Sequence, residues 1–189
     1  MTSKEAIFQA LKAARPEVFE KPDLSEVKSL SLRYEDPLAQ FCEAVKGSGG
    51  KVLRIEAGDS PEEAARSLFP EAEDICIAKG EFGVAENGCV YLEEPTDMPR
   101  VKYFISDTLV IVIDEESIVA NMHDAYDRLG EEVKGYGIFI SGPSKTADIE
   151  QALVFGAHGA RSVGVLLVRR RNAPAAQCSS GVLLRRREM

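Results

Sequence analysis

Residues 137–168 constrain the fold of this chain more than any other part of the sequence. A short apolar segment at 137–141 is followed by a loop of small residues, a segment with helical character and a second apolar segment at 163–168. Two strands joined through a helix within about 30 residues are typical of a crossover between parallel strands. We therefore predict the α/β class, with a mostly parallel sheet and helices on both faces.

Hydrophobic periodicity elsewhere in the chain predicts the same alternation of helices and strands. Apolar residues return at helical spacing in four segments: 3–14, 37–46, 61–69 and 116–129. Extended apolar segments predict strands at 51–56, 74–78, 84–92 and 108–113. The last of these is almost uninterrupted by polar residues, as expected of a strand that is covered on both faces.

The length of 189 residues and a hydrophobic content of 44% suffice for one domain with a sizeable core. We predict an N-terminal helical segment at 1–34, the domain at 35–168 and a basic, disordered tail at 169–189. No run of about 18 apolar residues is present, and the N-terminus has charged residues where a signal peptide has its apolar core. We therefore expect a cytoplasmic protein with no membrane insertion.

The net charge of −8 is unevenly distributed along the chain. Six arginines and a single acid fall within 169–189, so the other residues include 17 basic and 30 acidic side chains. A body this acidic repels nucleic acid and anionic membranes. We expect no nucleic-acid partner.

The cysteines and histidines do not form the pattern of a metal or cluster site. Cys42, Cys76, Cys89 and Cys178 are scattered without a C-x-x-C pair, and the two histidines are far apart in sequence. We predict no cofactor in this chain. Any redox chemistry would then fall to another protein.

The loop after the 137–141 strand has the composition of an anion-binding site. A predicted helix follows it, and the first N–H groups and dipole of a helix favour a carboxylate or phosphate. Asp148 and Glu150 would repel an anion and no phosphate-loop pattern is present, so nucleotide binding is not supported. A capped turn without a ligand stays open as the alternative. The candidate ligand-binding residues are Ser141, Gly142, Pro143, Ser144, Lys145, Thr146 and Asp148.

A second candidate site lies in the segment 83–90. Glu86 stands there among apolar and small residues, where a buried, partly desolvated carboxylate could act as acid, base or nucleophile. Asn87 and Gly88 follow it and are also candidate ligand-binding residues. The residues alone favour another interpretation, in which Asn87-Gly88 is the turn of a hairpin between 82–86 and 89–92.

Two motifs together resemble a known family. The sequences Gly-Val-Ala-Glu-Asn-Gly (83–88) and Ile-Ser-Gly-Pro-Ser-Lys-Thr-Ala-Asp-Ile-Glu (140–150), followed by Gly-Ala-His-Gly (156–159), resemble the lactate-utilisation (LUD) domain family of the LutC/YkgG type. The resemblance covers roughly residues 35–168. The chain departs from the family pattern at Asn87-Gly88-Cys89, where Thr-Gly-Thr is more common, and in the tail after residue 168.

The resemblance implies a fold similar to the NagB/RpiA/CoA-transferase superfamily. It also implies a role in the oxidation of L-lactate to pyruvate together with iron–sulfur lactate-utilisation proteins as partners. The iron–sulfur clusters are expected in those partners rather than in this chain. The ligand implied for the chain itself is a small carboxylate.

Three functional hypotheses follow. In the first, the chain is an accessory component of an iron–sulfur L-lactate utilisation system that binds a small carboxylate or a partner subunit. In the alternative, it is an independent acyl- or CoA-transferring enzyme with Glu86 as the catalytic nucleophile, because Glu86-Asn87-Gly88 is similar to the Glu-Asn-Gly motif of class I CoA-transferases. In the third, a regulatory or scaffolding role, the two motifs would lie far apart in space.

Overall fold

The structure, a computed structural model, divides the chain into two units, residues 1–30 and 31–189. The described residues are 2–14, 20, 23, 26, 30–130, 135–149, 152–155 and 159–170, with side chains described for all of these except 146–149 and 152–155. All but the first two residues of the predicted tail lie outside these ranges. The predicted three-part division of the chain stays a prediction.

The described part of the first unit is dominated by helix α1 (Ser3–Ala13), which confirms the helix predicted at 3–14. A capping box fixes its start: the Glu5 N–H donates to the Thr2 hydroxyl and the Thr2 N–H donates to the Glu5 carboxylate, at 3.4 and 2.7 Å. The helix therefore satisfies its first N–H groups through its own side chains.

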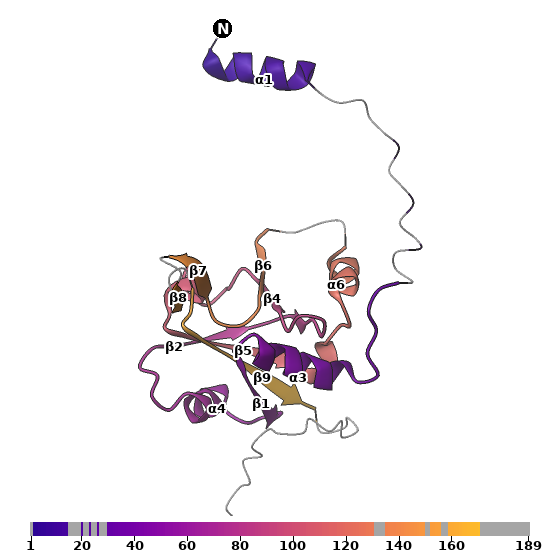
Figure 1. Ribbon diagram of the computed structural model, residues 1–189. Helices are drawn as coiled ribbons and strands as arrows, with labels where there is room; N and C mark the ends of the chain where they lie inside the picture. The colour runs from indigo at the N-terminus through magenta and orange to yellow at the C-terminus, as the bar shows by residue number, and fades with distance from the viewer. Residues whose placement is uncertain are drawn as a thin grey trace, which may run out of the picture. The chain divides into compact units, whose positions relative to one another are not determined.

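The second unit alternates helices and strands (Figure 1). Its elements are α3 (Pro37–Gly47), β1 (Lys51–Glu56), α4 (Pro61–Leu68), β2 (Ile75–Lys79), β3 (Phe82–Gly83), β4 (Val90–Glu93), α5 (Lys102–Ile105), β5 (Thr108–Asp114), the 3₁₀ helix η1 (Glu115–Ser117), α6 (Met122–Leu129), β6 (Gly137–Ile140), β7 (Lys145–Ile149), β8 (Ala152–Phe155) and β9 (Ser162–Arg169). The helices predicted at 37–46 and 61–69 and the strands predicted at 51–56, 74–78 and 108–113 are confirmed.

Four parallel strands form the central sheet, in the order β1-β9-β5-β2 (Figure 1). The amino ends of the two central strands coincide, since Thr108 is paired with Ser162. The parallel α/β sheet is therefore as predicted, and all its strands end at the same edge.

Helices cover both faces of this sheet. Side chains of each strand alternate between the two faces, so one strand contributes to both cores. Leu109 and Ile111 of β5 pack in one core with Phe41 of α3. Val110, between them, packs in a second core with Ala65 of α4. All five side chains are buried, and each large one contributes roughly 1.5–3 kcal/mol through its burial. The predicted helices on both faces are confirmed.

An antiparallel sheet of order β3-β4-β6 forms beside the parallel one. The antiparallel pairing of β3 with β4 confirms a hairpin here and replaces the single strand predicted at 84–92. The first strand ends at Gly83 instead of residue 86, so residues 84–89 form a longer connection than the predicted turn at Asn87-Gly88. Helix α6 packs on this sheet: Ala125 is in one cluster with Phe82, Tyr91 and Phe139. The Phe82 and Tyr91 rings stack with centroids 5.3 Å apart.

The crossover predicted for 137–168 is wrong. Strand β6 pairs antiparallel with β4 and is not part of the parallel sheet, and the predicted helix is replaced by the antiparallel hairpin β7–β8. The hairpin sequence includes Thr146, Ile149, Val154 and Phe155, residue types that favour strands. Hydroxyl and acidic residues start turns as readily as helices, so the local signal did not distinguish the two.

The helix predicted at 116–129 is shorter than expected. Helix α6 begins at Met122, after Asn121 caps it by accepting a hydrogen bond from the Asp124 N–H at 3.0 Å. Before the cap the backbone is extended at Val119, whose N–H donates to the Gly83 carbonyl at 2.9 Å. The residues before Asn121 therefore join the loop that contains Glu86 instead of the helix.

Candidate functional site

The two motif loops contact each other. The Ser141 hydroxyl, in the loop that follows β6, donates to the Asn87 carbonyl, in the loop between β3 and β4, at 2.9 Å. Gly88 packs so tightly against helix α3 that a Cβ there would lie 2.5 Å from the Val45 nitrogen. The second motif therefore lies beside the first, and not at a distance as the scaffolding hypothesis expects.

Glu86 is exposed, which contradicts the expectation of a buried carboxylate. Its carboxylate accepts a hydrogen bond from the Met122 N–H at 2.9 Å, and its own N–H donates to the Ala120 carbonyl at 3.1 Å. The loop turns outward here because its backbone pairs with residues 119 and 120 rather than continuing a strand. Glu86 therefore stabilises the positive end of α6.

Replacing Glu86 by alanine is expected to lower the free energy of unfolding by about 1 kcal/mol, because Met122 loses its hydrogen-bond acceptor and the helix dipole loses a charge. Glu86→Gln retains an acceptor oxygen and should lower the free energy of unfolding by about half as much. Urea unfolding of the two variants measures the difference. Equal stability of wild type and Glu86→Ala would contradict the capping role.

The loop of the second motif is held by two contacts. The Ser144 N–H donates to the Ala160 carbonyl at 2.9 Å, and the Lys145 ammonium donates to the Ser48 carbonyl at 2.6 Å. Gly142 has a φ of 65° and approaches Ser48 so closely that a Cβ would lie 2.5 Å from its hydroxyl. Lys145 thus neutralises the carbonyl end of α3 rather than serving as a cation inside the site.

Thr146 and Asp148 were also predicted to bind a ligand. Their backbone lies in strand β7, and their side chains are outside the described residues. His158 and Glu150 also lie outside them. The described candidates in this loop are therefore Ser141–Lys145.

The loop of residues 141–144 lies at the amino ends of the parallel strands. The predicted crossover, in which the loop follows a strand of the parallel sheet, would have placed it at their carboxyl ends. It borders Leu109 near the start of β5 and Val163 near the start of β9. The prediction failed because it placed the preceding strand in the parallel sheet. Residues 141–144 do follow the carboxyl end of β6, but β6 belongs to the antiparallel sheet.

A pocket of about 230 Å³ opens behind this loop, and we call it the loop pocket. The polar side chains among its described lining residues are those of Ser141, Ser144 and Tyr103, and the Tyr103 hydroxyl donates to the Glu93 carbonyl at 3.3 Å. The other described lining residues are apolar, glycine or proline. The lining residues are Tyr103, Phe104, Leu109, Phe139, Ile140, Ser141, Gly142, Pro143, Ser144, Gly159, Ala160 and Val163. Four of the predicted ligand-binding residues line the pocket; Glu86, Asn87, Gly88 and Lys145 do not.

The buried residues that line the inner side of the loop pocket were not predicted from the sequence. Tyr103, Leu109 and Val163 are each at most 3% exposed and look like ordinary core residues in the sequence. The signal that could have found them is that β5 and β9 start at the same sheet edge, which places the segments before them together. That signal needs the strand order, which the sequence does not provide.

Cys89 follows the Glu86-Asn87-Gly88 turn and is buried. Burial raises the pKa of its thiol to about 12, while its neighbour Asn87 opposes part of that rise by hydrogen bonding. A thiol with this pKa has very little thiolate near neutral pH and is therefore a poor nucleophile. Native protein should leave Cys89 unmodified by iodoacetamide at pH 8, as mass spectrometry after digestion would show.

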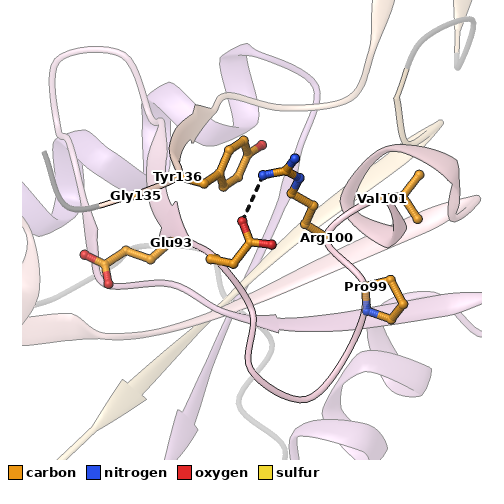
Figure 2. Close-up of a pocket in the computed structure, with 7 residues that line it drawn as sticks. Glu93, Pro99, Arg100, Val101, Gly135 and Tyr136 are labelled. Atoms are coloured by element: carbon orange, nitrogen blue, oxygen red, sulfur yellow. Dashed lines mark hydrogen bonds and ion pairs between the residues drawn. The ribbon is translucent and has the colours of Figure 1, made fainter.

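A wider hollow of about 920 Å³ lies near the end of β4 and the start of β6 (Figure 2). Arg100 stands there with its guanidinium carbon 4.8 Å from the centroid of the Tyr136 ring, and it forms an ion pair with Glu94 at 3.0 Å. Arg100 and Glu94 are thus already paired with each other, and none of the predicted site residues is among the described residues that line the hollow. The smaller loop pocket, which four of the predicted residues line, is therefore the candidate ligand site.

The described part of the chain shows neither a metal-binding group of side chains nor a membrane-spanning helix. Within the described ranges no three His, Cys, Asp or Glu side chains gather in a way that could hold a metal ion. None of the helices in the described part of the chain has the length and hydropathy of a transmembrane span. The expected absence of a cofactor stays a prediction.

Comparison with known proteins identifies the family. The LUD domain family matches residues 44–168, which include both motif loops and the whole parallel sheet. The chain belongs to the LUD domain family. In this LUD domain the second of the two motifs includes strand β7 and the loop of residues 141–144, which lines the loop pocket.

Curated relatives of this LUD domain include two proteins named Lactate utilization protein C. The one from Bacillus pumilus (strain SAFR-032) is 30% identical over 132 residues, covering 67% of this chain and 54% of that protein. The one from Bacillus subtilis (strain 168) is 32% identical over 104 residues, covering 52% of this chain and 43% of that protein. The chain spans about half the length of these relatives.

The fold is shared with a solved structure, the crystal structure of a DUF162 family protein from Deinococcus radiodurans. The TM-score is 0.56 at 16% sequence identity, over 73% of this chain and 99% of the other. At this identity the likeness shows a common α/β fold.

Proposed function

We propose that this LUD domain protein is an accessory component of an L-lactate utilisation system and binds a small carboxylate in the loop pocket. Electron transfer then takes place in iron–sulfur partner proteins. The observation that supports this most is that residues 141–144, the centre of the family motif, line a pocket closed by buried residues of the parallel sheet. The names of the Bacillus relatives point to the same pathway.

The chemistry of the loop pocket suits one carboxylate group. The Ser144 hydroxyl can donate to a carboxylate oxygen, whereas the single O–H of Ser141 already donates to the Asn87 carbonyl at 2.9 Å. A hydrogen bond to a charged group is stronger than one between neutral groups. The volume of about 230 Å³ is below the range of roughly 300–1,000 Å³ that is usual for drug-sized ligands. A ligand of few heavy atoms is therefore expected.

Two experiments test the proposal. Calorimetric titration with L-lactate and with pyruvate should show binding to the purified protein. Co-expression with candidate iron–sulfur lactate-utilisation proteins should recover a complex by affinity purification. If neither acid binds and no complex is recovered, the proposed function is wrong.

Replacing Ser144 by alanine is expected to weaken the binding of pyruvate about tenfold or more, because a hydrogen bond to a charged group contributes roughly 1.5–3 kcal/mol. Ser117→Ala is the matched control, since this serine lies after the carboxyl end of β5 and its hydroxyl donates to the Asp114 carbonyl at 2.6 Å. Calorimetry on both variants measures the change. Equal affinities in the two variants would contradict the role of Ser144.

Acyl or CoA transfer by Glu86 stays the alternative prediction. Attack by this carboxylate would require it to leave the Met122 N–H, which it accepts at 2.9 Å. Incubation with acetyl-CoA followed by borohydride trapping would modify Glu86 if the alternative were correct. We expect no modification of this residue.

A further inference from the structure

The loop pocket is polar at one side and apolar elsewhere. The Ser141 and Ser144 hydroxyls belong to the loop, and the Tyr103 hydroxyl donates to the Glu93 carbonyl. Leu109, Ala160 and Val163, which are each 5% exposed or less, provide aliphatic surface. Tyr103 and Phe104 add aromatic surface, with ring centroids 6.4 Å apart. An acid whose carboxylate lies against the serines would therefore direct the rest of its chain toward apolar side chains.

None of the described residues that line the pocket has a charged side chain. A carboxylate at the loop can stay partly hydrated, because Ser141 is exposed. A second carboxylate at the other end of the ligand would be buried against apolar side chains without a charged partner, which costs far more than a hydrogen bond returns. Methylene groups, in contrast, gain affinity when they leave water for an apolar surface. The pocket thus favours a ligand with a single carboxylate and an apolar chain.

We propose that the loop pocket selects monocarboxylic 2-oxo or 2-hydroxy acids that have an aliphatic side chain longer than the methyl group of pyruvate and lactate. This inference rests on the proposed function for the position of the carboxylate, but concerns the rest of the ligand. Ser144 sets the carboxylate end, because its hydroxyl can donate to the carboxylate, whereas the Ser141 hydroxyl donates to the Asn87 carbonyl. Phe104, Leu109 and Val163 set the length and shape of the tail.

A calorimetric series of unbranched 2-oxo acids, from pyruvate to 2-oxooctanoate, tests the inference. Affinity should rise about fourfold for each added methylene until the pocket is full and then fall. Oxaloacetate, with its second carboxylate, should bind at least a hundredfold more weakly than 2-oxovalerate. An affinity that does not change with length, tightest binding of pyruvate, or no binding of any acid would overturn the inference.

Two variants change the size of the pocket where the aliphatic part of the ligand would lie, one enlarging it and the other narrowing it. Phe104→Ala enlarges the pocket and should move the optimum to a longer acid, whereas Ala160→Val narrows it and should move the optimum to a shorter one. Phe8→Ala in α1, where the side chain is 53% exposed, is the matched control for the first and should leave the optimum unchanged. If neither pocket variant folds, the length series on the wild-type protein decides alone.

The outcome separates this inference from the proposed function. If pyruvate and lactate bind but longer acids bind no better, the inference is wrong and the accessory role stands. If longer acids bind in the predicted order but no iron–sulfur partner is recovered and lactate fails to bind, the inference stands and the accessory role is wrong.

Discussion

Replacing Gly88 by alanine is expected to lower the free energy of unfolding by about 4 kcal/mol. The residue has a φ of 68°, which strains any residue with a Cβ, and strain of this kind costs roughly 1–3 kcal/mol. The new Cβ would also lie 2.5 Å from the Val45 nitrogen and 2.7 Å from the Ala44 carbonyl carbon. These are backbone atoms of α3, so the contact cannot be relieved by a rotamer change, and overpacking adds another 1–3 kcal/mol or so.

Gly58→Ala separates the two contributions to this loss. Gly58 has a φ of 102°, but a Cβ there would meet no atom within 4 Å, so this variant includes strain without a clash. Gly58→Ala should lower the free energy of unfolding by about 1–2 kcal/mol. Urea unfolding of both variants gives the difference, and a Gly88 variant no less stable than the Gly58 variant would show that α3 does not pack against the motif loop.

Replacing Glu115 by alanine is expected to lower the free energy of unfolding by about 3–5 kcal/mol, the usual cost of removing one partner from a buried ion pair. The side chain of Glu115 is 4% exposed and follows β5 at the carboxyl edge of the parallel sheet. It accepts a hydrogen bond from Arg54 of β1 at 3.0 Å and lies 3.9 Å from Arg169 of β9. One carboxylate therefore links three strands.

Two controls belong to this prediction. Glu116→Ala, at an exposed neighbour in the same 3₁₀ helix, should change stability by less than about 0.5 kcal/mol. The double variant Arg54→Met/Glu115→Leu should recover part of the loss, because Arg54 is removed together with its partner and only Arg169 still loses its contact with Glu115. Thermal unfolding that shows equal losses for the Glu115 and Glu116 variants would contradict a structural role of the buried pair.

The strands of the parallel sheet and the helices that cover it could be predicted from the sequence because their signals are local, whereas the crossover at 137–168 from which we inferred parallel pairing does not exist. Apolar residues in β5 and β9 fill both faces of the sheet, and Ser60 and Asp36 cap their helices by accepting the Glu63 and Ala39 N–H groups. Periodicity and capping are properties of a few neighbouring residues. No knowledge of distant contacts was needed.

The candidate site could be predicted only in part. The sequence marked residues 141–144 and 86–88, but it gave the wrong structure after residue 144 and the wrong environment for Glu86. Both depend on contacts between distant residues: the Ser144 N–H with the Ala160 carbonyl, and the Glu86 carboxylate with the Met122 N–H. The apolar floor of the loop pocket depends on strand order, which local patterns do not encode.

The central claim is that the loop of residues 141–144 borders the ligand-binding pocket of this LUD domain. An NMR titration of ¹⁵N-labelled protein with pyruvate and with 2-oxovalerate tests it most directly. The account predicts that both acids shift the amide signals of Ser141, Gly142, Ser144 and Ala160, with larger changes at Leu109 and Val163 for the longer acid. Shifts confined to Arg100, Val101 and Tyr136 in the hollow of Figure 2, or no shifts at all, would contradict it.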